Sequence, residues 1–241
     1  MRVVSWNVQH LSVYTDVDVP AEEHFARALE DLFPDVLLLQ EVDEFNRRSG
    51  NVSHVRLAAE ATASSDFRFL ATPPDPGDYG IAIVSRVPVV AWSELRLPAS
   101  PVGQRLTFLE DGEPHRYYVA DHARAAIAAT LANGWTVVNT HCSFVPGVAQ
   151  LHALRVWQWA SRVAREAGTR LLVGGDLNLH KAGWLRAFGA EPLRGAPTFP
   201  AWEPTRQIDH LIVRRHELAQ KDLQVAARYE ISDHLPVWVE L

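Results

Sequence analysis

Short apolar runs separated by polar residues dominate the chain, and this pattern predicts mostly β-strands joined by a few helices. A first helix is indicated by apolar residues at helical spacing, and Pro34 ends that stripe. The stripe consists of Phe25, Ala28, Leu29, Leu32 and Phe33. A second helix is expected over about residues 52–63, and the proline-rich stretch 72–77 is expected to be a loop within one domain.

The longest helix is predicted over about residues 148–167. Leu151, Leu154 and Trp157 recur at helical spacing, which predicts that they share one buried face. Gly168 follows the last residue of this pattern, and glycine is the common residue just beyond a helix end.

The remaining apolar runs predict strands spread along the whole chain. They cover residues 3–6, 36–39, 66–70, 81–85, 89–97, 117–120, 125–131, 136–140, 171–174, 208–213, 223–226 and 237–241. With this many strands and only three helices, the economical arrangement is two sheets packed face to face with the helices outside. Sandwiches of this length often form one unit, so a single domain over residues 1–241 is expected.

Composition narrows the class of protein. The chain is 47% hydrophobic and 22% charged with a formal net charge of −6, which matches a folded globular protein and excludes a strongly basic nucleic-acid coat protein. Cys142 is the one cysteine, so no intrachain disulfide can form. No apolar run reaches the length of a membrane span, and the first residues lack the pattern of a secretory signal. A cytoplasmic protein without integral membrane association is expected.

Polar residues recur where the apolar strands stop. They are Asn7, Gln40, Glu41, His141, Asp176, Asn178, Asp209, Asp233 and His234. Because the ends of strands present rigidly placed side chains to one rim, these groups are candidates for one site. Carboxylate and amide oxygens suit Mg²⁺, which usually keeps waters and substrate phosphate as further ligands. No HExxH or paired CxxC motif indicates a zinc site.

Six short motifs also occur in an order that resembles the endonuclease/exonuclease/phosphatase family, which contains deoxyribonuclease-I-like nucleases, inositol-phosphate phosphatases and neutral sphingomyelinases. They are Ser5-Trp6-Asn7-Val8, Leu39-Gln40-Glu41-Val42, Thr140-His141, Gly175-Asp176-Leu177-Asn178, Ile208-Asp209-His210 and Ser232-Asp233-His234-Leu235-Pro236. Each motif is short, but the set spans nearly the whole chain. The resemblance implies an α/β fold, a four-layer sandwich of two packed, mostly antiparallel sheets flanked by helices. It also implies Mg²⁺, with Mn²⁺ as an alternative.

The resemblance further implies roles for the site residues. Glu41 would be the principal metal ligand, with Asn7 beside it and Asp233 in the metal environment. Asp209 would orient His234, which would activate the attacking water. The catalytic set would be completed by Asp176, Asn178 and His141, the last two also contacting the phosphate.

Two further residues are assigned to substrate binding. Arg124 resembles an arginine that the family places near the phosphate, although its flanks are plain alanines. Trp202 lies in a segment expected over the site rim, where it could stack on a substrate group; the alternative is that it closes a local core together with Phe199. Abasic-site endonucleases of the family carry different residues where this chain has Gln9 and His10, which argues against that activity.

An aspartate next to a histidine in the sequence does not by itself identify a catalytic pair. Three Asp-His doublets occur, beginning at Asp121, Asp209 and Asp233. Neighbours in a strand point to opposite faces, so a working pair should join Asp209 to His234 across elements. Asp121 is interpreted as a surface or turn residue, His210 as structural, and Cys142 as a small buried hydrophobe.

The sequence therefore predicts a Mg²⁺-dependent phosphoesterase, either a phosphodiesterase or a nuclease, in which water attacks phosphorus directly. Its substrate would be a phosphate ester, with nucleic acids or nucleotides among the candidates, and no obligate protein partner is indicated. One alternative is a phosphatase of small phosphorylated metabolites or inositol-type headgroups. Another is a module that binds nucleotides or phospholipids without cleaving them, although such proteins should have lost some of the positions that are present here.

Overall fold

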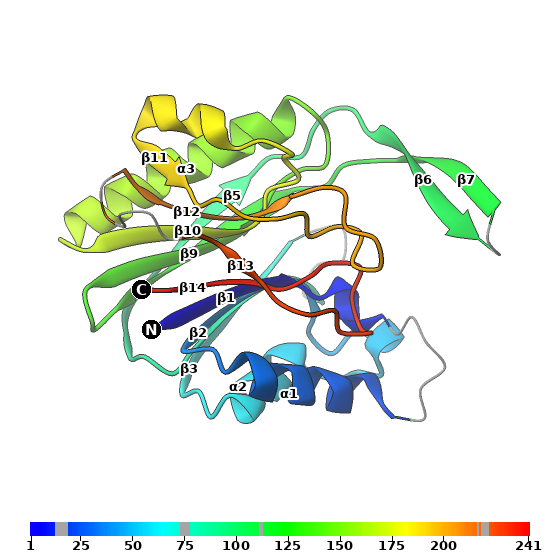
Figure 1. The fold of residues 1–241 in the computed structure, drawn as a ribbon, viewed down its shortest axis with the longest axis horizontal. Helices are drawn as coiled ribbons and strands as arrows, with labels where there is room; N and C mark the ends of the chain where they lie inside the picture. The colour runs from blue at the N-terminus through cyan, green and yellow to red at the C-terminus, as the bar shows by residue number, and fades with distance from the viewer. Residues whose placement is uncertain (13–18, 73–77, 111–112, 216, 218–221) are drawn as a thin grey trace.

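Two six-stranded sheets form the centre of the computed structural model (Figure 1). The structure describes residues 1–12, 19–72, 78–110, 113–215, 217 and 222–241. The first sheet has the order β13 (Gln224–Val225), β14 (Val237–Glu240), β1 (Arg2–Asn7), β2 (Val36–Asp43), β4 (Tyr79–Ser85), β3 (Asp66–Ala71). The second has the order β11 (Ala190–Pro192), β12 (Asp209–Arg214), β10 (Arg170–Asp176), β9 (Trp135–His141), β8 (Arg124–Leu131), β5 (Val89–Leu97).

Each sheet contains one parallel pair, and every other pairing in it is antiparallel. The parallel pairs are β1 with β2 in the first sheet and β9 with β10 in the second. In both cases a helix crosses between the two parallel strands, as such a connection requires: α1 (Ala21–Leu32) in the first sheet and α3 (Val148–Glu166) in the second. The expectation of two mostly antiparallel sheets is confirmed.

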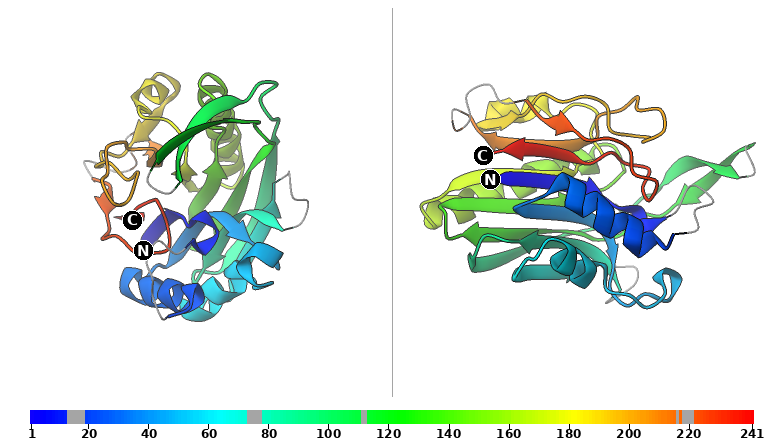
Figure 2. Two further views of the ribbon diagram at one scale, coloured as in Figure 1. Left: turned by 90° about the vertical axis from the view of Figure 1, so that its right-hand side faces the viewer. Right: turned by 60° about the horizontal axis from the view of Figure 1, so that its bottom comes forward.

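The helices cover the outer faces of the sheets, so the fold has four layers (Figure 2). The helices α1 and α2 (His54–Ala61) pack on the first sheet, and α3 packs on the second. Alternation along β2 explains this: Val36 and Leu38 join the core between the sheets, whereas Leu37 and Leu39 face the helices. Both faces of the central strands are therefore buried, and the predicted sandwich is confirmed.

The helix boundaries agree with the predicted ones within a few residues, but two buried positions were wrong. Phe33 lies beyond the end of α1 in a left-handed conformation and is 62% exposed. Leu151 is 44% exposed, because the buried face of α3 is centred on Ala153, Val156 and Trp157. Leu151 therefore lies at the edge of the buried face of α3.

A two-stranded ribbon was missed by the sequence analysis. It consists of β6 (Gln104–Glu110) and β7 (Glu113–Val119), inserted between β5 and β8, and it projects from the body of the protein (Figure 1). The predicted strand over 117–120 is the end of β7.

Three short 3₁₀ turns are present among the described residues: η1 (Gln9–Leu11), η2 (Arg47–Ser49) and η3 (Gly183–Phe188). The predicted loop over 72–77 falls almost wholly outside the described residues, at 73–77. Among the described residues no helix has the length and apolarity of a membrane span.

Gly175 is required by the close approach of β9 and β10. Its φ is +141°, and a Cβ at this position would lie 1.8 Å from the carbonyl oxygen of Thr140. We expect Gly175→Ala to lower the free energy of unfolding by about 4 kcal/mol or more, because strain and a backbone clash add. Gly134→Ala is the matched control: its φ is +85°, but a Cβ would meet nothing within 4 Å. Urea unfolding of both variants tests this, and equal losses would contradict it.

Candidate active site

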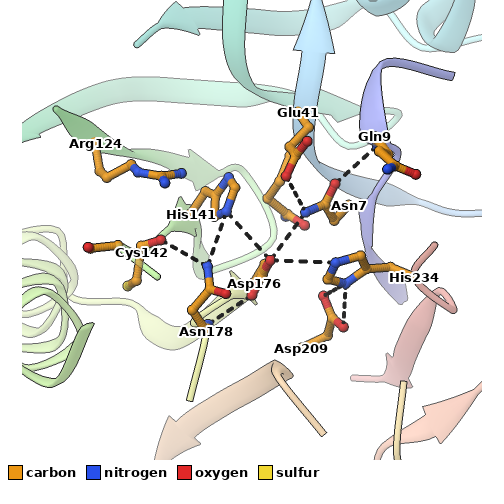
Figure 3. A network of polar contacts seen from close by, with 12 residues as sticks. Asn7, Gln9, Glu41, Arg124, His141, Cys142, Asp176, Asn178, Asp209 and His234 are labelled. Atoms are coloured by element: carbon orange, nitrogen blue, oxygen red, sulfur yellow. Dashed lines mark hydrogen bonds and ion pairs between the residues drawn. The ribbon is translucent and has the colours of Figure 1, made fainter. Parts of the chain in front are cut away.

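The predicted polar residues meet at one edge of the sandwich, where strands from both sheets end (Figure 3). Asn7 and Glu41 come from β1 and β2 of the first sheet, and His141 and Asp176 come from β9 and β10 of the second. Asp209 begins β12 opposite Asp176 in the strand register. His234 follows from the loop before β14. The two sheets therefore each supply half of the site.

Asp209 and His234 form a buried pair across elements. Nδ1 of His234 lies 2.9 Å from Oδ2 and 3.2 Å from Oδ1 of Asp209, so the imidazole donates from Nδ1 to the carboxylate. The hydroxyl of Thr198 also donates to Oδ2 of Asp209, at 2.5 Å. This arrangement fixes the ring and leaves its Nε2 facing the site. As expected, His210 points elsewhere, with Nε2 2.7 Å from the carbonyl oxygen of Leu179.

The position of His234 is set by its surroundings as well as by Asp209. Its backbone N–H donates to Oγ of Ser232 at 3.0 Å, and its carbonyl oxygen accepts a hydrogen bond from Nε1 of Trp6 at 3.0 Å. The ring of Phe199 packs against the imidazole with 4.9 Å between centroids. Contacts from Trp6 and Phe199, which are distant in the sequence, and from the neighbouring Ser232 therefore help to hold this residue in one orientation.

Asp176 lies at the centre of the network. Its Oδ2 accepts a hydrogen bond from Nδ2 of Asn7 at 3.2 Å and lies 3.5 Å from Nε2 of His141 and 3.8 Å from Nε2 of His234. Its Oδ1 accepts from the backbone N–H of Asn178 at 2.8 Å. Figure 3 shows these side chains converging on the Asp176 carboxylate. The predicted residues of the two sheets are thus joined through one buried carboxylate.

Asn178 and His141 form the neighbouring part of the network. The amide Nδ2 of Asn178 donates to the carbonyl oxygen of Cys142 at 3.1 Å and lies 3.3 Å from Nε2 of His141. Burial, followed by the nearby Arg124 charge, lowers the pKa of His141 well below 6.5. A neutral imidazole and an amide at this position can hydrogen-bond to the oxygens of an anionic ligand.

Glu41 projects into the site from a bulge in β2. The register against β4 shifts between Gln40 and Val42, and Glu41 has φ +55°. A buried clamp fixes this bulge: Nε2 of Gln40 donates to Oδ1 of Asn139 at 2.7 Å, and Nδ2 of Asn139 donates to the carbonyl oxygens of Leu39 and Ala82 at 2.7 and 2.8 Å. Bulges commonly re-aim a side chain next to an active site.

The carboxylate of Glu41 is only partly engaged. Its Oε1 accepts a hydrogen bond from Nδ2 of Asn7 at 3.0 Å, and the side chain remains 23% exposed. Asp233 is the other partly exposed carboxylate, with Oδ1 3.8 Å from Nε2 of His234. These two residues can offer carboxylate oxygens to a ligand that enters from solvent.

Burial and the crowding of acidic groups shift the pKa values of the site. Burial raises the pKa of Asp176 to about 7 and that of Asp233 to about 6. Burial alone would lower the pKa of His234, but the carboxylates of Asp209, Asp176 and Asp233 outweigh it and raise that pKa to about 10. The site therefore has an excess of negative charge that a cation would neutralise.

The donor set fits a hard divalent cation. Asp176, Asp209 and His234 have ligand atoms that all lie within 4.8 Å of one another. Asp209, however, already accepts hydrogen bonds from His234 and Thr198. Glu41 and Asp233 therefore fit the cation better, because their side chains are partly exposed, and Asn7 and Asp176 adjoin them.

The pKa shifts predict how stability depends on pH and on cations. The raised pKa of His234 gives stability that is complete below about pH 6.5 and is lost as the pH rises through about 10. The raised pKa of Asp176 destabilises the fold progressively as the pH rises from about 3.8 through about 7.

We therefore expect the metal-free protein to melt at a lower temperature at pH 9.5 than at pH 7. Added Mg²⁺ should raise the melting temperature more at pH 9.5. If Mg²⁺ raises the melting temperature by the same amount at both pH values, the prediction is contradicted.

Arg124 begins β8 beside the network, and Asp121 holds it there. The guanidinium is 4% exposed, with Nη2 3.7 Å from Oδ1 of Asp121 and with Nε unpartnered among the described residues. The other oxygen of Asp121 accepts from the backbone N–H of Ser100 and from the hydroxyl of Ser143. The interpretation of Asp121 as a surface residue was wrong, because its side chain is fully buried. Figure 3 places the Arg124 guanidinium next to His141.

Trp202 lies outside the contacts described so far. It is 47% exposed, and the aromatic residue of its loop that touches the network is Phe199, through His234. Its role in substrate binding stays a prediction. Cys142 is buried, and burial raises the pKa of its thiol to about 12, so the interpretation as an inert hydrophobe agrees with its environment.

Three contributors to the site were missed from the sequence. Thr198 carries no local signal, because the residue that it holds lies on another element. Asp121 lies only three positions before Arg124, but the burial of its side chain depends on tertiary packing. Tyr79 is the third, because burial, followed by the charge of Glu41, raises its pKa well above 10. The signal that could have indicated Tyr79 is its place directly before Gly80, at the strand end opposite the Glu41 bulge.

Comparison with known proteins indicates the family and the fold of the chain. The family model described as "Endonuclease/Exonuclease/phosphatase family" matches residues 4–234. A Beutenbergia cavernae protein of that description has a TM-score of 0.66 at 21% identity, covering 98% of this chain and 70% of its own. Among curated protein sequences, none matches the chain.

Two other solved structures carry the same fold with more specific names. The Bacteroides thetaiotaomicron mannosyl-6-phosphatase has a TM-score of 0.65 at 17% identity, with 100% and 98% of the two chains covered. The human Nocturnin catalytic domain with bound sulfate has a TM-score of 0.64 at 17% identity, with 99% and 92% covered. At this level of identity the likeness extends to the fold.

Proposed function

Because the chain belongs to the endonuclease/exonuclease/phosphatase family, we propose that it is a divalent-metal-dependent phosphodiesterase in which water attacks phosphorus directly. The observation that supports this most strongly is the Asp209–His234 pair, whose free Nε2 faces Asp176 at 3.8 Å within the network that includes Glu41. A general base held by a buried carboxylate, beside an oxygen-rich cation site, is suited to hydrolysis of a phosphate ester.

His234 would accept the proton of the attacking water at Nε2 once a bound cation offsets the carboxylates that raise its pKa to about 10 in the metal-free protein. Asp209 holds the Nδ1–H, so the lone pair of the neutral ring lies on Nε2. The 3.8 Å gap between Nε2 and Oδ2 of Asp176 leaves room for a water that hydrogen-bonds to both. Asp176 would align that water, and the proton released on attack would pass to the imidazole.

The phosphoryl group would be bound on the other side of Asp176. Asn178 and His141 would donate hydrogen bonds to its non-bridging oxygens, and the buried Arg124 guanidinium would balance its charge. Glu41, with Asn7 and Asp233, would hold a Mg²⁺ or Mn²⁺ ion. When bound, that ion neutralises charge on the phosphoryl oxygens and lowers the pKa of nearby groups.

The test compares a diester with a monoester. Hydrolysis of bis(p-nitrophenyl) phosphate and p-nitrophenyl phosphate would be followed with Mg²⁺, with Mn²⁺ and with excess chelator. We expect metal-dependent cleavage of the diester that vanishes in Glu41→Ala. Preference for the monoester would favour the alternative, a phosphatase of small metabolites; the named activity of the Bacteroides thetaiotaomicron relative is of that kind. No hydrolysis together with no calorimetric metal binding would favour a non-catalytic binding module.

A further inference from the structure

A strained turn begins two residues after Asn7. Gln9, His10 and Leu11 have φ values of +43°, +44° and +59°, and none of them is glycine. Such a conformation is unfavourable for residues other than glycine and persists only where the surroundings enforce it. The turn is enforced on both sides of His10: the N–H of Gln9 donates to Oδ1 of Asn7 at 3.0 Å, and the Leu11 side chain is buried in the core. The turn therefore fixes where His10 points.

His10 points toward Glu41. Its Nδ1 lies 4.0 Å from Oε2 of Glu41, the oxygen that does not accept from Asn7. This nitrogen is shielded from solvent, and within the part of the chain that the structure describes it has no hydrogen-bond partner. A shielded nitrogen left unpaired is costly and calls for an explanation such as a bound ion.

The separation of the two atoms is suited to a shared metal ion. At 4.0 Å they are too far apart for a hydrogen bond. Two ligands that each lie about 2.1 Å from an ion are separated by up to about 4.2 Å. Both residues have left-handed backbone conformations, with φ +44° at His10 and +55° at Glu41. Two strained positions thus bring an imidazole nitrogen and a carboxylate oxygen face to face.

We propose that His10 is a nitrogen ligand of the ion held by Glu41 and that it biases the site toward a divalent transition metal such as Mn²⁺ over Mg²⁺. The inference rests on the proposed function in taking Glu41 as a metal ligand. Mg²⁺ prefers an all-oxygen octahedron, whereas imidazole nitrogen binds transition-metal ions more readily. The residues at this turn therefore set which cation the site selects.

The test measures metal binding without substrate. Calorimetry with Mn²⁺ and with Mg²⁺ would be done on the wild type, His10→Asn and His122→Asn. Asparagine tolerates the left-handed conformation and removes the imidazole, so His10→Asn keeps the turn. His122, whose Nδ1 lies 3.0 Å from the carbonyl oxygen of Ala123, is the control. We expect His10→Asn to weaken Mn²⁺ binding about 10-fold or more and to leave Mg²⁺ binding unchanged.

A spectroscopic readout complements the affinities. In electron spin-echo measurements of the Mn²⁺-loaded protein, the imidazole nitrogen signal should be present in the wild type and in His122→Asn and absent in His10→Asn. A persistent nitrogen signal, or equal loss of Mn²⁺ and Mg²⁺ binding, would overturn the proposal. The variant Glu41→Gln distinguishes failure of the proposed metal site from failure of the role of His10. If Glu41→Gln leaves metal binding intact, the proposed metal site is wrong. If Glu41→Gln abolishes binding while His10→Asn binds Mn²⁺ like the wild type, only the role of His10 is wrong. His10→Gly, which relieves the strain, guards against a misfolded variant.

Discussion

Replacing His234 by alanine is expected to lower kcat for diester hydrolysis by about 10³-fold while metal affinity stays near the wild-type value. The imidazole is held by Asp209 at 2.9 Å, and its Nε2 is the one basic nitrogen that faces both Asp176 and Asp233 among the described residues. A general base of this kind contributes about 10²–10⁴ in rate. Because Glu41 and Asn7, two of the proposed metal ligands, lie on other elements, calorimetric binding of Mg²⁺ should persist.

His115→Ala is the control for this measurement, because His115 lies exposed on the ribbon strand β7. A second variant, Asp209→Asn, should also lose activity, since an amide does not hold the ring with the charge of a carboxylate. Steady-state kinetics over pH 6–10 would separate the two effects. His234→Ala with wild-type kcat would contradict the assignment of the base.

Glu41→Gln is expected to abolish detectable turnover together with metal binding. Glu41 is the most exposed carboxylate of the network, and Asn7 holds its Oε1 at 3.0 Å so that Oε2 remains open. The amide keeps the size of the side chain but removes its charge, and hard divalent cations depend on charged oxygen ligands. The expected loss is at least about 10³-fold in kcat/KM, measured at the Mg²⁺ concentration that saturates the wild type.

The matched control is Glu60→Gln, because Glu60 is exposed on α2 away from the network. Calorimetry would be paired with hydrolysis of bis(p-nitrophenyl) phosphate in both variants. Retained Mg²⁺ binding in Glu41→Gln would show that other carboxylates hold the ion, and Asp176 would then be the first to examine.

Much of the architecture could be predicted because the strands are buried on both faces. The apolar run 36–39 and its polar ending at Gln40 and Glu41 are visible in the sequence, and so are both the strand β2 and the rim residues that follow it. The ribbon β6–β7 could not be predicted in the same way. The side chains of β7 alternate without a buried face, since the strand is exposed along almost its whole length.

The sequence indicated which residues form the site, but not which residues hold them in place. Asn7, Glu41, Asp176 and His234 were indicated by their places at strand ends, and the structure joins them in one network. The buried clamp of Gln40 and Asn139, whose positions are 99 residues apart, depends on how the two sheets pack. Similarly, Asp121 resembles a turn residue until the packing encloses it beside Arg124. Such contacts are set by tertiary structure, and local sequence carries no sign of them.

The hydrogen bonds that position His234 and Asp176 also determine when the site is assembled in a refolding chain. Trp6 bonds to His234 across 228 positions, Ser232 to Asn7 across 225, and Asn7 to Asp176 across 169. Contacts of such high sequence separation close the largest loops available to the chain and form slowly. Native secondary structure should therefore return well before turnover does. The recovery of activity after dilution from denaturant would report the final docking of the first sheet against the second.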